Sequence, residues 1–184
     1  MVQELKLLEY YNMNLPVLTD RLEGEYYAPI RSLCEDAITH AMDITRNGNT
    51  QSPARIYTNF CLNLLFTIKH DIAERQSILL PLAKRLYEKR QDGHDCATCT
   101  GNCKVDNDDV DINNIGEANN VIIDSMCRLH KLAMPAYLYT EQPAAYKELR
   151  YKMLALYTGL LELFFIEESA LFTAISTLQK HHAA

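Results

Sequence analysis

The sequence predicts an all-α protein: a four-helix bundle with long helices and a cysteine-rich loop between the second and third main helices. Glycine and proline are scarce, six of each in 184 residues, and they separate long stretches whose apolar residues have helical spacing. No period of roughly 20 to 50 residues recurs, which argues against a repeat solenoid. One long connection after the second helix fits the bundle architecture.

The first long helix is expected to begin at a proline and to end at a glycine. After a short apolar segment that ends at Pro16, the predicted helix starts at Pro29 and stops at Gly48. Apolar residues from Ile30 to Ile44 recur at spacings of three and four, which places them on one helical face.

The second predicted helix has a clear start and one interruption. Ser52 is placed to cap it, Pro53 falls in its first turn, and helical spacing continues to about Arg90. Pro81 lacks the N–H that would bond to the carbonyl of Ser77, and its ring crowds that carbonyl. Regular helical bonding is therefore expected to fail between Ser77 and Pro81.

The remaining chain reads as a loop followed by two helices. Residues 93–111 are rich in Asp, Asn, Gly, Thr and Cys, which is typical of a loop. A third helix is predicted over 112–133 and is stopped by Pro135. The fourth is predicted from about 140 to 179, with Pro143 in its first turn.

Composition limits the class of protein. A chain of this length with 48% hydrophobic residues can bury one sizeable core, so residues 1–184 are taken as a single domain. The net charge of −6 repels phosphate backbones and anionic membranes, so neither nucleic acid nor a membrane is an expected partner. The first residues lack the features of a secretory signal, and a cytoplasmic location with reduced cysteines is expected.

The loop contains an unusual group of metal-binding residue types. The stretch HDCATCTGNC holds His94, Cys96, Cys99 and Cys103 within ten residues. These four side chains suit tetrahedral zinc or an iron–sulfur cluster, and the alternatives are a set of redox thiols or no role at all. The other three cysteines, which fall at or near apolar helical faces, are expected to be small core residues: Cys34, Cys61 and Cys127.

Glu168 is a candidate interior ligand in the fourth helix. At about 100° per residue it falls near the centre of the apolar stripe, and its neighbour Glu167 falls on the edge. A buried carboxylate is costly unless it is paired or binds a metal; the alternative is a carboxylate bonded to a buried Tyr or Arg. The stripe is defined by Met153, Leu161, Phe164, Leu171, Phe172 and Ile175.

Three histidines complete the candidate ligand set. His70 and Glu74 have the spacing that stacks two side chains on one helical face, so both could reach one ion. The strongest apolar stripe of their helix lies nearly opposite His70, so a solvated pair is the alternative. His40 and His130 each stand at the margin of their helix's apolar stripe, where a boundary residue is the alternative to a ligand.

Taken together, these residues resemble the hemerythrin-like (HHE) family. Its four-helix bundles hold a non-haem di-iron centre with His and carboxylate ligands from all four helices. The family also has a His one turn before the Glu of its fourth helix, where this chain has Phe164. The resemblance implies that the metal ligands are His40, His70, Glu74, His130 and Glu168.

The function expected from this resemblance is iron binding in oxygen, nitric oxide or redox handling. The cysteine loop would be a second metal or thiol site, and the partners would be a small diatomic ligand or a redox partner protein. The competing class is a non-catalytic helical interaction module or homodimer without metal. In that class the apolar surplus of the second helix, between Phe60 and Ile68, would form the interface.

Overall fold

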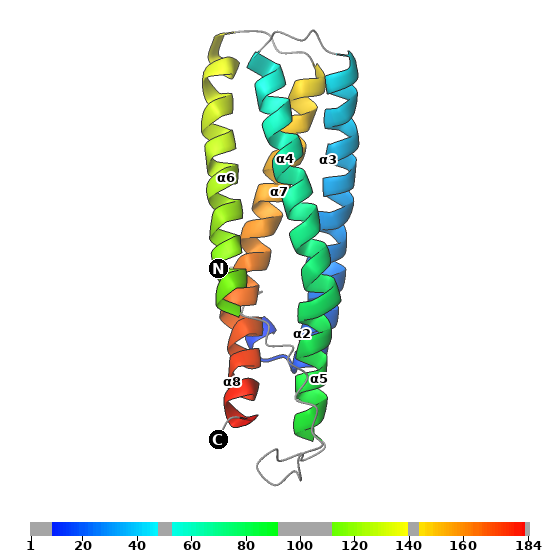
Figure 1. Ribbon diagram of the computed structural model, residues 1–184, viewed down its shortest axis with the longest axis vertical. Coiled ribbons are helices and arrows are strands. Elements are labelled where there is room, and N and C mark those ends of the chain that lie inside the picture. Colours follow the sequence, from blue (N-terminus) through cyan, green and yellow to red (C-terminus); the bar gives the residue numbers. More distant parts are fainter. Residues whose placement is uncertain (1–8, 48–52, 92–111, 140–143, 183–184) are drawn as a thin grey trace.

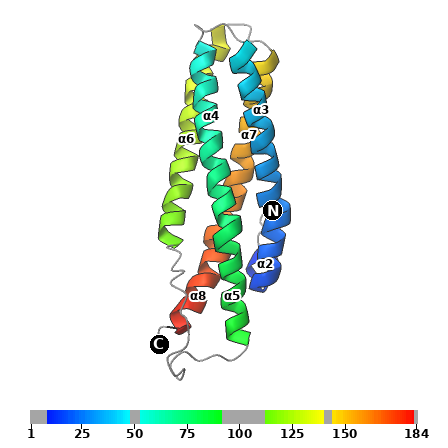
Figure 2. The same cartoon turned by 45° about the vertical axis from the view of Figure 1, so that its right-hand side comes forward.

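A computed structural model describes residues 9–47, 53–91, 112–139 and 144–182, and all the elements assigned within these ranges are helical. Four long helical arms lie side by side along one axis, and arms that follow each other in sequence run in opposite directions (Figures 1 and 2). The predicted cysteine-rich loop lies outside the described residues.

Three of the four arms are α-helices joined through a short π-helical turn, in which backbone bonds span five residues instead of four. The first arm is α2 (Leu15–Leu22), η1 (Glu23–Tyr27) and α3 (Ala28–Asn47). The second is α4 (Pro53–Glu74), η2 (Arg75–Leu79) and α5 (Leu80–Gln91). The third is α6 (Ile112–Tyr139) alone, and the fourth is α7 (Ala144–Ile166), η3 (Glu167–Leu171) and α8 (Phe172–His182). The expected end of the third helix before Pro135 is wrong, because α6 continues through this proline to Tyr139.

The expected start of the first helix at Pro29 is wrong. The arm begins at Leu15, where the side chain of Asn14 accepts a hydrogen bond from the N–H of Val17 at 3.0 Å. Pro29 is tolerated inside the arm because η1 immediately precedes it. In η1 the N–H of Ala28 donates to the carbonyl of Glu23, five residues back. The regular pattern of α-helical hydrogen bonds is therefore already interrupted next to Pro29, which has no N–H to donate.

The expected interruption at Pro81 is confirmed, and it has the same form. In η2 the N–H of Leu80 donates to the carbonyl of Arg75, five residues back, and Pro81 follows. At the equivalent place after η3 stands Thr173, whose hydroxyl donates to the carbonyl of Glu168 at 3.4 Å. A proline therefore stands two positions after the π-turn in the first and second arms, and a threonine stands there in the fourth.

One apolar core runs through the molecule. The arms pack in the cyclic order α3, α4, α6, α7, and α2, α5 and α8 continue the packing at one end (Figure 1). Cys34 and Cys61 are buried in this core, as expected, and burial raises the pKa of each thiol to about 12. Cys127, which was also expected in the core, is only partly buried. No helix in the described ranges combines the length and the apolar character that spanning a membrane requires.

Candidate functional site

Each helical arm places one polar side chain inside the core at a common level. The four residues are Tyr27 at the end of η1, Arg75 at the start of η2, Asn119 in α6 and Glu167 at the start of η3. All four are buried, and Glu167 has 0% of its surface exposed. We call this set the polar layer.

Glu167 and Arg75 form the centre of the polar layer. One carboxylate oxygen of Glu167 accepts a hydrogen bond from the Tyr27 hydroxyl, and the other accepts one from Nη1 of Arg75. Nη2 of Arg75 donates to Oδ1 of Asn119 at 2.7 Å and lies 2.8 Å from Oδ2 of Asp71. One cation thus holds together side chains from three arms, and Tyr27 adds the fourth.

The Arg75 guanidinium is almost fully enclosed, with 2% of its surface exposed. Its Cζ lies 4.9 Å from the centre of the buried Phe164 ring, which is a cation–π contact. Two buried polar atoms, Nε of Arg75 and Oδ2 of Asp71, have no hydrogen-bond partner among the described residues, so the contact between Arg75 and Asp71 is ionic.

Burial sets the protonation of the polar layer. Burial raises the pKa of the Glu167 carboxyl, and the opposing effects of Arg75 and Tyr27 only reduce this shift. Burial, with the charge of Glu167, also raises the pKa of the Tyr27 hydroxyl well above its usual value, so this group stays protonated and donates a hydrogen bond to the carboxylate. For Arg75, burial lowers the pKa, but the charges of Glu167 and Asp71 outweigh that effect and keep it raised.

The register of the fourth arm explains why Glu168 was predicted to be interior and is not. Before η3 the buried positions are Leu160 and Leu163, and the same spacing continued forward reaches Glu167. After η3 they are Leu171 and Ile175, and the same spacing continued backward reaches Glu168. The π-turn inserts one residue between the two registers, and the exposed Glu168 keeps only a 3.5 Å contact with Nδ2 of Asn119.

The predicted pair His70 and Glu74 faces solvent. The His70 side chain is 82% exposed, and its Nδ1 lies 3.9 Å from Oε2 of Glu74. The interior pair with the same spacing is Asp71 and Arg75, one residue further along the helix. The sequence contained a signal for it, because Arg75 follows Ile72 by three residues on the strongest apolar stripe of this helix.

The other predicted ligands are also separated from the polar layer. Nε2 of His40 lies 2.8 Å from the carbonyl oxygen of Ala145 and 3.9 Å from Oε2 of Glu148, while His130 is exposed on α6. Across the described ranges, no three His, Cys, Asp or Glu side chains gather closely enough to hold a metal. The remaining predicted ligands, which lie outside the described residues, are His94, Cys96, Cys99 and Cys103.

The interior does not fit the di-iron centre that the resemblance implied. Such a centre needs several anionic or imidazole ligands directed at one point. Here the central position is taken by the Arg75 guanidinium, which already neutralises Glu167 and Asp71. One turn before Glu167 stands the buried Leu163, which supplies no ligand atom.

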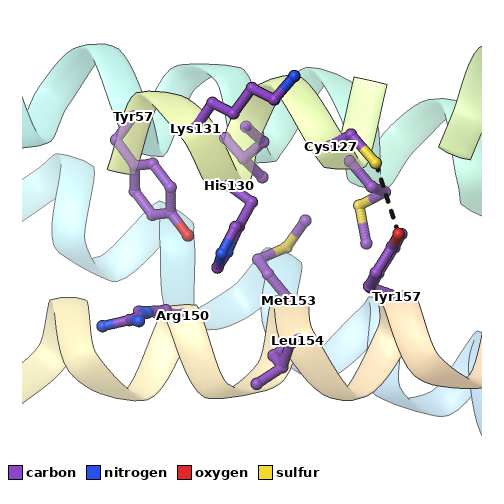
Figure 3. A pocket seen from close by; sticks show the side chains of 10 residues that line it. Tyr57, Cys127, His130, Lys131, Arg150, Met153, Leu154 and Tyr157 are labelled. Atoms are coloured by element: carbon purple, nitrogen blue, oxygen red, sulfur yellow. Dashed lines mark hydrogen bonds between the residues drawn. The ribbon is translucent and has the colours of Figure 1, made fainter. Parts of the chain in front are cut away.

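A second feature is a groove between α6 and α7, with a volume of about 220 Å³ (Figure 3). Met126 and Leu129 of α6 and Met153 of α7 form its apolar floor. At one end Sγ of Cys127 lies 3.4 Å from the Tyr157 hydroxyl, and this hydrogen bond raises the pKa of Tyr157. His130, Lys131, Arg150 and the Tyr57 ring complete its wall.

Comparisons with protein-family models, with curated proteins and with solved structures found no match to this chain. Its own residues define it as an all-helical protein with a charged polar layer in its core and an apolar groove with basic side chains in its wall.

Proposed function

We propose that this chain is a four-helix bundle that acts as a non-catalytic, self-associating interaction module, with Arg75 in the interior position that a metal would take. The observation that carries this proposal is a stripe of large apolar side chains on the solvent side of α7. Tyr151, Leu154, Leu161 and Phe165 are between 41% and 71% exposed. They lie opposite the buried face of the same helix.

The order of residues along this stripe is nearly symmetric. At spacings of three and four, it contains in sequence order Lys147, Tyr151, Leu154, Thr158, Leu161, Phe165 and Glu168. We call these seven residues the outer stripe. A two-fold axis near Thr158 would place Tyr151 against Phe165 of a second copy. It would also place Leu154 against Leu161 of that copy.

Charge complements this pairing. The same two-fold arrangement brings Lys147 at one end of the outer stripe to Glu168 at the other end of the second copy. Opposite charges at the two ends favour the antiparallel direction and disfavour the parallel one, in which like charges would meet. The paired region would be about 32 Å long, at about 1.5 Å per residue from Lys147 to Glu168. A second copy is thus the partner that this surface fits best.

Sedimentation equilibrium of the full chain in reducing buffer, over a series of concentrations, tests the proposal. The native chain is expected to form a dimer, and Leu161→Glu to remain a monomer, because the charge would be buried opposite Leu154. Val121→Glu changes an exposed apolar residue of α6 outside the outer stripe, and this control is expected to dimerise normally. A native chain that stays monomeric, or equal behaviour of the two variants, would refute the self-association.

A charge exchange tests the antiparallel direction separately. Lys147→Glu should weaken the dimer, because it places two carboxylates together at each end. Adding Glu168→Lys to that variant should restore association, since each end again carries opposite charges. If the double variant were no better than the single one, the proposed pairing would be wrong. Circular dichroism of each variant checks that the helices remain intact.

A second candidate function concerns the cysteine loop. Cys96, Cys99 and Cys103, with His94, have the residue types that hold zinc or an iron–sulfur cluster. Elemental analysis of anaerobically purified protein separates this site from the bundle interior. A variant with all three loop cysteines replaced by Ser should contain no iron if Arg75 fills the interior. Stoichiometric iron in that variant would instead support the hemerythrin-like function in oxygen, nitric oxide or redox handling.

A further inference from the structure

The groove between α6 and α7 opens beside the outer stripe. Leu154 belongs to both features, because it lines the groove and is 50% exposed on the solvent side of α7. The floor of the groove consists of the buried side chains of Met126, Leu129 and Met153. A second copy that covers the outer stripe would therefore also reach the mouth of the groove.

The groove has the size and the chemistry to hold an aromatic ring. Its volume is about 220 Å³, whereas an apolar cavity of about 150 Å³ is enough to hold benzene. In Figure 3 Met153 lies between the end at Arg150 and the end where Cys127 and Tyr157 are hydrogen-bonded. Methionine side chains adapt their shape to a neighbour, and their sulfur atoms make favourable contacts with aromatic rings.

The antiparallel pairing brings Phe165 of the second copy to this place. Phe165 follows Thr158 by seven residues and Tyr151 precedes it by seven, so these two residues face each other across the two-fold axis. A helical side chain leans toward the N-terminus of its own helix. For Phe165 of the second copy, this direction runs from Tyr151 toward Leu154 on the first copy. Its ring would therefore lie over Met153.

The other large side chains of the outer stripe are placed less well for the groove. Leu161 of the second copy faces Leu154 and leans toward Thr158, beyond the middle of the groove. Tyr151 and Leu154 of the second copy lean toward the far end of the paired region. Phe165 is 50% exposed in the single chain, so its ring is accessible to another copy.

We propose that the groove is the socket of the dimer, in which the Phe165 ring of a second copy packs on Met126, Leu129 and Met153. This inference rests on the proposed self-association and names the contact that anchors it. By two-fold symmetry the contact occurs twice in each dimer, and each groove is completed by the other copy. An aromatic side chain in an apolar pocket is the usual form of an interface hot spot.

A matched pair of phenylalanine variants tests how much this contact contributes. Phe165→Ala should raise the dissociation constant of the dimer at least about a hundredfold, because two rings leave their grooves. Phe66→Ala is the control: Phe66 is 48% exposed on α4, and it is not among the described residues that line the groove. This variant should keep the native dissociation constant within about twofold. Equal effects of the two variants in sedimentation equilibrium would overturn the proposal.

Nuclear magnetic resonance of a mixed dimer tests the contact itself. One set of full-length chains carries labelled methionine methyl groups, and the other carries labelled phenylalanine rings. Nuclear Overhauser effects between the two sets are expected at Met126 and Met153 but not at Met42, which lies on α3 outside the groove. They should disappear when the ring-labelled chain carries Phe165→Leu, at a concentration where the mixed dimer still forms.

The same measurements separate this inference from the proposed function. A native chain that stays monomeric would overturn both. A native dimer without effects between copies at Met126 and Met153 would leave the self-association standing and overturn the socket. Effects that persist with Phe165→Leu would place a different phenylalanine in the groove, which would also overturn the assignment of Phe165.

Discussion

Two arginines at different levels of the bundle show how burial decides what a charge can do. Arg75 is enclosed and contacts the carboxylates of Glu167 and Asp71, so its charge is used within the fold. Arg150 is half-buried in the wall of the groove, and the described residues that line the groove with it include no Asp or Glu. A charge in the core must be neutralised there, because water cannot reach it, whereas water can solvate a charge at an open edge.

The largest effect on the free energy of unfolding is expected when the same substitution is made separately at each arginine. Arg75→Met leaves the buried Glu167 and the partly buried Asp71 without their counter-ion, and should lower the free energy of unfolding by about 3–5 kcal/mol. Arg150 is only half-buried, so Arg150→Met should change the free energy of unfolding by about 1 kcal/mol or less. Urea denaturation at one fixed protein concentration measures both. Similar losses for the two variants would contradict the comparison.

A double variant tests whether the loss comes from a stranded charge. Arg75→Met combined with Glu167→Met removes both ions and fills the space with apolar groups of similar size. It should recover a large part of the stability lost in Arg75→Met, because one uncompensated carboxylate has gone. If the double variant were less stable than the single one, the polar layer would contribute through hydrogen bonding and shape more than through charge.

A smaller effect on the free energy of unfolding is expected at high pH. The pKa of Tyr27 is raised mainly by burial, so above about pH 10 the unfolded chain loses this proton while the native chain keeps it. Native stability should therefore fall as pH rises, by up to about 1.4 kcal/mol per pH unit from this group. Tyr27→Phe should reduce the slope of unfolding free energy between about pH 10 and 11.

Part of the slope should remain after Tyr27→Phe. Burial also raises the pKa of Tyr10, whose hydroxyl donates a hydrogen bond to Oε2 of Glu25 at 2.7 Å. A slope that is identical in Tyr27→Phe and the native chain would mean that Tyr27 ionises as easily in the fold as outside it.

The smallest effect on the fold is expected from the cysteine loop. Cys99→Ser should remove any metal or absorbance that belongs to the loop, because three thiols and a histidine are needed for a complete ligand set. Helix content and the free energy of unfolding of the four arms should not change. A variant that keeps its full metal content would show that the loop is only a connector.

The π-turns account for most of what could not be foreseen in the core. The fourth helix was treated as one regular α-helix, so the apolar positions before and after its π-turn were counted as a single stripe. Glu168 was therefore predicted to be the interior carboxylate, although the buried one is Glu167. Tyr27 was missed because Pro29 was taken as a helix start. Arg75 and Asn119 could have been found, since each stands on the apolar stripe of its own helix. The same test that singled out Glu168, a polar residue at an apolar position, applies to them.

The sequence by itself determined the all-helical class, the start of the second arm at Pro53, the interruption before Pro81 and the apolar stripes. These depend on local backbone preference and on side-chain periodicity, which the chain carries in its own order of residues. Only the tertiary structure decided that four polar residues from four arms meet around one guanidinium, and that basic side chains border a groove. Both depend on the relative rotation of helices that are far apart in sequence. The single extra residue of a π-turn changes the direction of the side chains that follow it by about 100° around the helix axis.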